Sequence, residues 1–432
     1  MREFLRKALV ATLIWEARTV VRKYRPHIVA ITGSVGKTST KDAVYSVLAQ
    51  THHVRKSEKS FNSDIGLPLT ILGCPNAWNN PLRWLQNIFD GLVLIVFRAH
   101  YPRWLVLEVG ADKPGDISSF AKWLPVDIAV ITRLPEMPVH VEFFDSPQAV
   151  VEEKASLIKA LKPEGTLVLY GDDERTRALG ARVEGTGVRV LTFGTKPHAD
   201  VRAAHVAMVR EGGWPTGMSA QLEIGGHSAP VRIEGVLGTP ALFSMLAAAA
   251  VGSALGKNVT EIVTALETYE PPHGRMRLLS GIKNTLIIDD TYNSSPAAVV
   301  AALDTLVLIK SKGRKIAVLG DMLELGRYSV EEHRKIGAQV AKTADALVTV
   351  GFRARGIAEG ALDAGMPDGS ILQYDDAHRA GSELEAALGG GDCVLVKGSQ
   401  SMRMERIVEM LMQEPERARE LLVRQDTDWK KR

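Results

Sequence analysis

The sequence predicts an α/β protein with two successive units, each a mainly parallel sheet with helices on both faces. Two observations support this fold class. Short β-branched or aliphatic runs alternate with segments of helical length, first between residues 27 and 170 and again between 285 and 412. The run EPPHG at 270–274 interrupts this alternation, and such a cluster of proline and glycine is typical of a boundary between units.

The expected elements follow from the period of each apolar run. In the first unit, β-branched and aliphatic runs predict strands at 27–32, 104–109, 127–132 and 166–170, with helices at 37–50 and 149–161. Residues 186–234 predict short β-rich pieces between glycine and proline turns, and an alanine-rich helix follows at 242–255. In the second unit we expect strands at 285–289, 315–319, 346–350 and 392–396, and helices at 297–309, 330–342 and 402–412.

These elements divide the chain into four parts. The last part is rich in charge and is expected to be a solvated helix or a frayed end. The four parts are a basic amphipathic helix at 1–26, a central unit at 27–270 with an insertion at 74–104, a C-terminal unit at 271–413, and the charged tail at 414–432.

Composition excludes several classes of protein. A chain of 432 residues is too long for one typical hydrophobic core, which indicates more than one domain. The content of 45% hydrophobic and 24% charged residues excludes a wholly disordered or collagen-like chain. The 53 basic residues nearly balance the 50 acidic ones, so no nucleic-acid partner is expected. Cys74 and Cys393 are too few for a cysteine-rich metal site, and we expect free thiols in a reducing cytoplasm.

The N-terminal helix and the insertion allow two interpretations. The helix carries seven basic and two acidic side chains over residues 2–25, and the insertion is rich in tryptophan and aliphatic residues. Neither reaches the roughly 20 apolar residues that a membrane span needs, and no secretory leader is expected. The two segments either form a basic surface in peripheral contact with a membrane or pack on the body as ordinary structure. The apolar stripe expected to pack or bind is Val10, Ile14, Ala17 and Val21.

The sharpest motif is TGSVGKTST at 32–40, between an expected strand and an expected helix. Glycines let the backbone curl around a phosphate, and amide groups of the helix N-terminus point at it. Lys37 would reach the β- and γ-phosphates, and Thr38 would hold Mg²⁺. The alternative is a glycine-containing surface turn. The residues expected to bind the nucleotide are Gly33, Ser34, Val35, Gly36, Lys37, Thr38 and Ser39.

The form TGxxGKT is typical of the Mur ligases, and further motifs follow in the order of that family. They are NSDIGLPLT at 62–70, LEVGAD at 107–112, HVE at 140–142, DDTYN at 289–293, LGDMLELG at 319–326 and VKGS at 396–399. From residue 27 to about 412 the chain therefore resembles the Mur ligase family.

The resemblance implies a P-loop-type central ATPase domain followed by a Rossmann-like C-terminal domain. It also implies a cytoplasmic enzyme of peptidoglycan precursor synthesis that uses ATP and Mg²⁺ and joins an amine to a carboxylate through an acyl phosphate. The LGDMLELG and VKGS motifs favour the branch that adds D-Ala-D-Ala to a UDP-muramoyl peptide. We expect a monomer.

The resemblance assigns three residues to the reacting phosphoryl group beside Lys37. Glu108 would bind a metal ion at the carboxyl end of its strand, and His140 would bind a second one. Lys154 falls where the family carries a carbamylated lysine, which presents an anion instead of a cation. The alternatives are a surface glutamate, a structural histidine and an exposed helix lysine.

The resemblance also assigns residues that contact the two substrates. Asp290 and Asn293 would close over the nucleotide from the C-terminal unit, and Arg275 would reach its phosphates. The alternative is that they are caps or surface residues. The residues assigned to the acceptor and the amine are Asn62, Lys397, Ser399 and Ser401.

Departures from the family pattern keep other functions open. Only residues 1–26 precede the first expected strand, where the branch carries a domain that grips the UDP-sugar. Pro240, Ala241 and Ser244 stand where the family has residues that hold the adenine base, and Ser295 and Gln400 also depart from its motifs. The alternatives are a Mur-like ligase on another or lipid-linked acceptor, a non-catalytic nucleotide-binding scaffold, and an unrelated P-loop ATPase.

Overall fold

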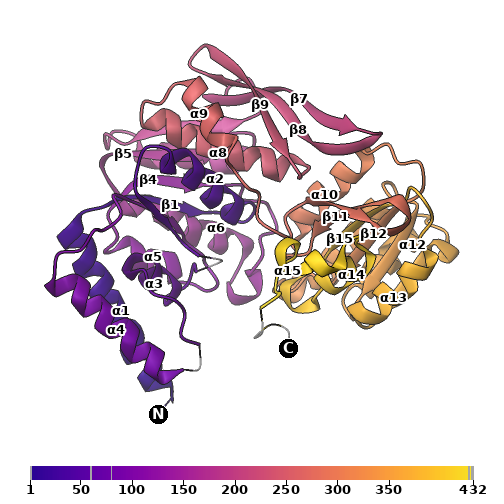
Figure 1. Ribbon diagram of the computed structural model, residues 1–432, viewed down its shortest axis with the longest axis horizontal. Coiled ribbons are helices and arrows are strands. Elements are labelled where there is room, and N and C mark those ends of the chain that lie inside the picture. Colours follow the sequence, from indigo (N-terminus) through magenta and orange to yellow (C-terminus); the bar gives the residue numbers. More distant parts are fainter. Residues whose placement is uncertain (1, 59–60, 79, 427–428, 430–432) are drawn as a thin grey trace.

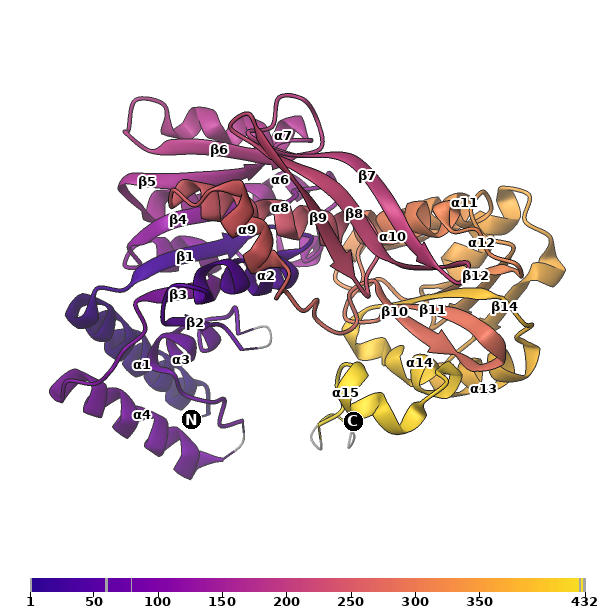
Figure 2. The same ribbon diagram turned by 45° about the horizontal axis from the view of Figure 1, so that its top comes forward.

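Two separate sheets underlie the fold, as expected for an α/β protein with mainly parallel sheets. The computed structural model describes residues 2–58, 61–78, 80–426 and 429. Figure 1 shows the two α/β bodies side by side, and Figure 2 shows strands of the first body reaching over the second.

The larger sheet has nine strands, of which the first six are parallel and the last three form an antiparallel extension. The four strands expected at 27–32, 104–109, 127–132 and 166–170 are confirmed, whereas the strand at 54–56 was not expected. In their spatial order the nine strands are β2 (Val54–Lys56), β3 (Trp104–Glu108), β1 (His27–Thr32), β4 (Val126–Ile131), β5 (Leu161–Tyr170), β6 (Arg189–Gly194), β7 (Val201–Glu211), β8 (Trp214–Ile224) and β9 (His227–Glu234).

Helices cover both faces of this sheet because alternate strand residues point to opposite sides. Ile31 packs with one set of helices and Ile28 with the other. The first set is α2 (Lys37–Ala49), α8 (Thr239–Ala254) and α9 (Val259–Leu266). The second set is α1 (Arg2–Tyr24), α3 (Gly66–Leu72), α5 (Asp116–Ala121) and α6 (Pro147–Ala155), followed by the short α7 (Glu174–Arg177).

The segment 186–234 is not a series of short pieces, so that expectation is wrong. β7 and β8 each have 11 residues and pair along most of their length. Their far ends pack with the second body, where Met218 shares a buried apolar cluster with Leu286 and Ile288. Leu237 and Val150 belong to the same cluster, so the two bodies share one core.

The smaller sheet has six strands, five parallel and one antiparallel at an edge. In their spatial order they are β10 (Arg277–Gly281), β11 (Thr285–Asp290), β15 (Cys393–Lys397), β12 (Lys315–Gly320), β13 (Ala346–Val350) and β14 (Ile371–Tyr374). One face is covered by α10 (Pro296–Leu308), α11 (Ser329–Val340) and α12 (Arg355–Asp363), and the other by α13 (Ala377–Ala387), α14 (Glu405–Leu411) and α15 (Ala418–Leu421).

Two expectations for the C-terminal part are corrected. The helix expected at 402–412 begins only at Glu405, because Arg403 has a φ of 55° and interrupts the helical path. The tail is not a solvated end, because Leu422 and Arg424 are buried against the second body. α12, β14 and α13 were not expected from the sequence.

Helices α1 and α4 (Pro81–Val96) form a parallel pair that projects at the lower left of Figure 1. Lys23, at the end of α1, donates hydrogen bonds to the carbonyl oxygens of Leu94 and Ile95 at the end of α4 (2.8 and 3.0 Å). The amine satisfies backbone groups that a helix C-terminus leaves without partners. The insertion is therefore built onto the N-terminal helix.

The buried stripe of α1 differs from the one expected. Leu13, Ala17, Val20 and Val21 are buried, whereas Val10 and Ile14 are only half-buried. Glu16 is also buried, and neither of its carboxylate oxygens has a hydrogen-bond partner among the described residues. No helix in the part of the chain that the structure describes has the length and apolar character to cross a bilayer.

The buried Glu16 predicts an unusual dependence of stability on pH. Burial raises the pKa of this carboxyl group from 4.5 to about 7. Between these values the folded chain keeps a proton that the unfolded chain has lost, so the free energy of unfolding falls as pH rises. We expect Glu16→Gln to raise stability at pH 8 by on the order of 2 kcal/mol and to change it little at pH 4.5.

Urea unfolding of both proteins at the two pH values measures this difference. An equal effect of Glu16→Gln at pH 4.5 and pH 8 would show that the substitution acts through packing against Gly91 rather than through charge.

Candidate functional site

The loop between β1 and α2 is shaped by two glycines with positive φ. Gly33 has a φ of 141°, and a side chain there would overlap Thr132 at the end of β4. Gly36 has a φ of 84° and caps α2. The loop therefore lies close to the neighbouring strand and leads directly into the N-terminus of α2, as expected for a phosphate-binding loop.

Two lysines approach this loop from different elements. The Lys37 amine donates a hydrogen bond to the Gly33 carbonyl oxygen (3.1 Å), and the Lys154 amine on α6 donates to the Ser34 hydroxyl (2.8 Å). Burial lowers the pKa of Lys37, and the charge of Arg275 lowers it further, although Glu108 opposes this shift. Burial also holds the pKa of Lys154 well below its usual range, and the nearby charge of Lys37 adds to this shift.

Glu108 ends β3 beside the loop, at the carboxyl edge of the parallel strands. Its side chain is buried, and one oxygen accepts a hydrogen bond from the Asn62 amide (3.4 Å). The other oxygen has no hydrogen-bond partner among the described residues. A buried carboxylate oxygen without a partner fits a cation, because desolvation of this charge is otherwise uncompensated.

His140 lies where the two bodies meet. It has a φ of 70°, and its Nδ1 is 2.7 Å from a Glu324 carboxylate oxygen of the second body. The same contact lowers the pKa of Glu324. Nε2 of His140 faces Asp112 at 3.7 Å. Within the described ranges no three His, Cys, Asp or Glu side chains gather as metal ligands, so the assignment of His140 to a metal stays a prediction.

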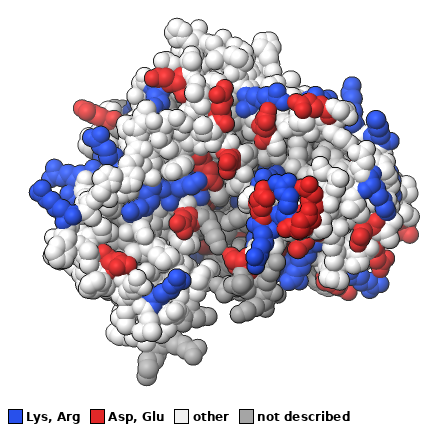
Figure 3. All heavy atoms as spheres, in the orientation of Figure 1, with Lys and Arg blue, Asp and Glu red and all other residues white. Residues whose placement is uncertain are grey.

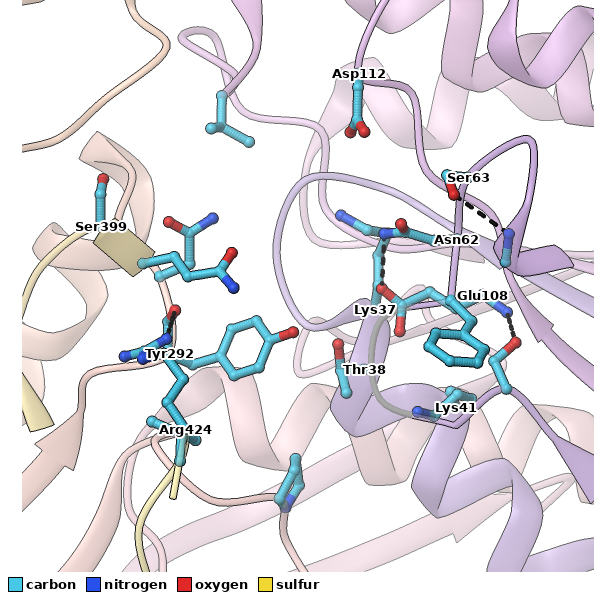
Figure 4. A pocket seen from close by; sticks show the side chains of 18 of the residues that line it. Lys37, Thr38, Lys41, Asn62, Ser63, Glu108, Asp112, Tyr292, Ser399 and Arg424 are labelled. Atoms are coloured by element: carbon cyan, nitrogen blue, oxygen red, sulfur yellow. Dashed lines mark hydrogen bonds between the residues drawn. The ribbon is translucent and has the colours of Figure 1, made fainter. Parts of the chain in front are cut away.

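The second body supplies the opposite wall of a cavity of about 1920 Å³. Figure 4 shows Lys37, Thr38 and Glu108 on one side and Tyr292, Ser399 and Arg424 on the other. Arg275 stacks over the Tyr292 ring, with 4.1 Å from the guanidinium carbon to the ring centroid. The volume is larger than the roughly 300–1,000 Å³ that is typical of small-molecule sites.

The structure distributes the predicted site residues between the cavity wall and the layer behind it. The predicted residues on the wall are Ser34, Val35, Gly36, Lys37, Thr38, Asn62, Glu108, His140, Arg275, Asn293, Ser399 and Ser401. Those outside the lining are Gly33, Ser39, Lys154, Asp290 and Lys397.

Lys397 and Asp290 form a buried ion pair behind the wall. The Lys397 amine is 2.6 Å from an Asp290 carboxylate oxygen and also donates to the Asn293 carbonyl oxygen (2.8 Å). Burial lowers the pKa of Lys397, although Asp290 opposes this shift. The pair therefore fixes the loop at 290–293 beneath the cavity, and a direct contact of Lys397 with substrate stays a prediction. The hydroxyl of Ser399 accepts a hydrogen bond from the Leu323 amide (2.9 Å).

Arg424 is the main residue of the site that the sequence did not indicate. Its guanidinium donates to the carbonyl oxygens of Thr291 (2.5 Å) and Tyr292 (3.0 Å), and it pairs with the buried Glu405 at 2.8 Å. The two carbonyl contacts join residues more than 130 positions apart, and no local pattern indicates them. Arg6 of α1 and Trp78, just before α4, also line the cavity.

Two family descriptions match the chain. The Mur ligase middle domain matches residues 31–80 and 92–252, and the Mur ligase glutamate ligase domain matches residues 274–400. The residues between the first two matched stretches fall within α4.

Several known proteins are similar over most of their length. UDP-N-acetylmuramoyl-tripeptide–D-alanyl-D-alanine ligase of Bacillus subtilis is 28% identical over 400 residues, which cover 92% of this chain and 79% of the relative. The enzyme of the same name from Mycobacterium tuberculosis is 30% identical, with coverage of 89% and 72%. The crystal structure of MurF ligase from Thermotoga maritima in complex with ADP has a TM-score of 0.76 and 28% identity, and covers 94% of this chain and 84% of that one.

Proposed function

The chain belongs to the Mur ligase family, and from this premise we propose that it is an ATP-dependent ligase of peptidoglycan precursor synthesis. Its substrates are a UDP-muramoyl peptide, which supplies a carboxylate, and D-Ala-D-Ala or a similar amine. The observation that carries the proposal is the phosphate-binding loop with Lys37 and Glu108, which faces the wall of the second body across one cavity.

The residues of the first wall handle the phosphoryl group. Lys37 places a cation at the γ-phosphate, and the amides of the loop bind the other phosphate oxygens. Thr38 and the unpaired oxygen of Glu108 would hold Mg²⁺. Bound Mg²⁺ neutralises charge on the oxygens of the transferring phosphoryl group.

The carboxylate of the acceptor attacks the γ-phosphorus, and ADP leaves. The amine then attacks the resulting acyl phosphate, and phosphate leaves as the amide bond forms. We assign Asn62 to the acceptor and Ser401 to the amine, since both line the cavity and Ser401 is exposed. Asn293 closes over the nucleotide from the second body, and Arg275 reaches its phosphates. Asp290 and Lys397 act as positioning residues behind the wall, and Arg424 holds the loop at 291–292 from the wall itself.

We further propose that Lys154 carries a carbamate. Burial lowers the pKa of Lys154, which raises the share of neutral amine above that of an exposed lysine, and the neutral amine is the form that attacks CO₂. A bond forms between Nζ and the carbon of CO₂, one C=O bond becomes C–O⁻, and the nitrogen releases a proton. The anion would sit beside Ser34 and Lys37, where it offsets positive charge.

The proposal extends to the organisation and surroundings of the protein. The division at 27–270 and 271–413 is supported by the two sheets, which the chain completes one after the other. We propose a monomer in the cytoplasm, in peripheral contact with the inner face of the membrane. A lipid-linked acceptor is the second candidate function, and it is favoured by the exposed apolar side chains of α4 beside the cavity.

A phosphate-release assay with product mass spectrometry tests the proposed reaction. ATP, UDP-muramoyl-tripeptide and D-Ala-D-Ala together are expected to give one phosphate per amide bond, and omission of any one should stop release. Phosphate release that ignores both the acceptor and the amine would contradict the ligase assignment and favour a simple ATPase.

A further inference from the structure

Helix α4 exposes an apolar face in addition to the face that packs on the body. Its fully buried residues are Asn87 and Gly91, and Gly91 lies against the carboxylate of Glu16 on α1. Trp84, Leu94 and Ile95 are half-buried against the core. A helix that packs on a core normally has a polar outer face. The apolar side chains of the outer face recur every three or four residues, which places them on one stripe, and they are between 39% and 75% exposed. This outer stripe is Leu82, Leu85, Phe89, Leu92 and Val96.

Helix α1 adds exposed apolar side chains to the same helix pair. Phe4, Leu5 and Trp15 are more than half exposed. Figure 3 shows that the lower left lobe, which α1 and α4 build, is mostly uncharged on the face turned to the viewer. Soluble monomers rarely expose so many large apolar side chains together, so this lobe is expected to contact another apolar surface.

The charges around the outer stripe are mainly positive. Arg18 and Arg22 on α1 and Arg83 on α4 are exposed. Among the side chains of the two helices that the structure describes, the carboxylates are Glu16, which is buried, and Asp90, which is half-buried. The lobe therefore combines an apolar stripe with a cationic rim.

We propose that the α1–α4 pair docks on an anionic lipid bilayer, with the outer stripe in the interface and the cationic rim at the headgroups. Aliphatic and tryptophan side chains gain from burial at the boundary between headgroups and acyl chains, and arginine gains from anionic lipid. A second copy of the chain is a poorer occupant, because it would bring two cationic rims together.

The docking surface adjoins the cavity. Arg6 near the start of α1 and Trp78 just before α4 line the cavity, and the outer stripe begins at Leu82. A bilayer against the helix pair would therefore lie beside the cavity mouth. The inference rests on the proposed function for what the cavity does, but the surface itself is tested without substrate.

Sedimentation with vesicles of three parts phosphatidylcholine to one part phosphatidylglycerol tests the surface. The full chain is expected to pellet with these vesicles at low salt and to stay in the supernatant with pure phosphatidylcholine. Leu85→Ser with Phe89→Ser should weaken binding at least about tenfold, because two large side chains leave the interface. Arg18→Gln with Arg22→Gln should weaken it by about fivefold per cation removed at low salt.

The matched control is Leu308→Ser with Phe352→Ser on the second body. These two side chains are 66% and 78% exposed, comparable with 64% for both Leu85 and Phe89. The control variant should bind vesicles as the original chain does. Equal weakening in both double variants, or an original chain that stays in the supernatant at low salt, would overturn the inference.

Analytical ultracentrifugation without lipid tests whether a second copy of the chain covers the outer stripe instead of a bilayer. If the original chain dimerises and the variant with Leu85→Ser and Phe89→Ser stays monomeric, the outer stripe is an interface with a second copy. That result would overturn the proposal of bilayer docking. Amide formation from soluble substrates should be the same in the original chain and in both double variants. If the original chain forms no amide bond from soluble substrates, the proposed function fails. The docking proposal is unaffected, because vesicle binding is measured separately.

Discussion

Lys37→Ala is expected to reduce the rate of amide formation about a thousandfold, the loss typical when a positioned group leaves a developing charge uncompensated. The amine of Lys37 lies over the Gly33 carbonyl in the phosphate-binding loop, next to Glu108 and Arg275. Without it, the negative charge that accumulates on the transferring phosphoryl group loses its nearest cation. Single-turnover assays with saturating ATP would measure the loss on the chemical step.

Lys159→Ala is the matched control, because Lys159 is an exposed lysine of the same body that lies outside the cavity lining. It should retain the rate of the original chain. Thermal unfolding should show both variants folded, since Lys37 is only half-buried and makes one hydrogen bond to its own loop. A rate for Lys37→Ala within a few-fold of the original would remove the phosphate-binding role of this loop.

Lys154→Ala is expected to be nearly inactive, with a loss on the order of a thousandfold, and to regain part of its activity with acetate or formate. The space left by the side chain lies beside Ser34 and Lys37, where a small carboxylate would supply the anion that a carbamate supplies in the original chain. Activity should rise with the concentration of the added acid until the site is filled.

The carbamate itself has a separate signature. Carbon-13 NMR of the original chain in labelled bicarbonate should show a carbamate signal that Lys154→Ala lacks. Because burial lowers the pKa of Lys154, carbamate should form at a lower pH on this residue than on an exposed lysine. Full activity in Lys154→Ala, or no carbamate signal in an active sample, would exclude the modification.

The parts of the site that could be predicted from the sequence are local. The loop at 33–38 depends on a strand, two glycines and a helix start that are adjacent in the chain, and the structure places it as expected. Glu108 could be placed because a residue that ends a parallel strand lies at the carboxyl edge of its sheet.

The rest of the site depends on contacts between distant parts of the chain. Arg424 reaches the carbonyl groups of Thr291 and Tyr292, and a charged tail gives no signal that one of its side chains will be buried. The buried face of α1 differs from the predicted stripe because α4 covers Glu16. This face therefore includes a carboxyl group, which hydrophobic periodicity cannot indicate.

The core that the two bodies share limits how the cavity can open. Met218 and Leu237 of the first body are packed with Leu286 and Ile288 of the second, and separating them would expose apolar surface to water. An opening motion that costs little free energy is therefore a rigid-body rotation of the two bodies about this shared core, which stays packed. Residues of the shared core would keep their neighbours during this rotation, while the two walls of the cavity move apart. Substrates would then enter through the widened opening of the cavity, while water stays excluded from the shared core.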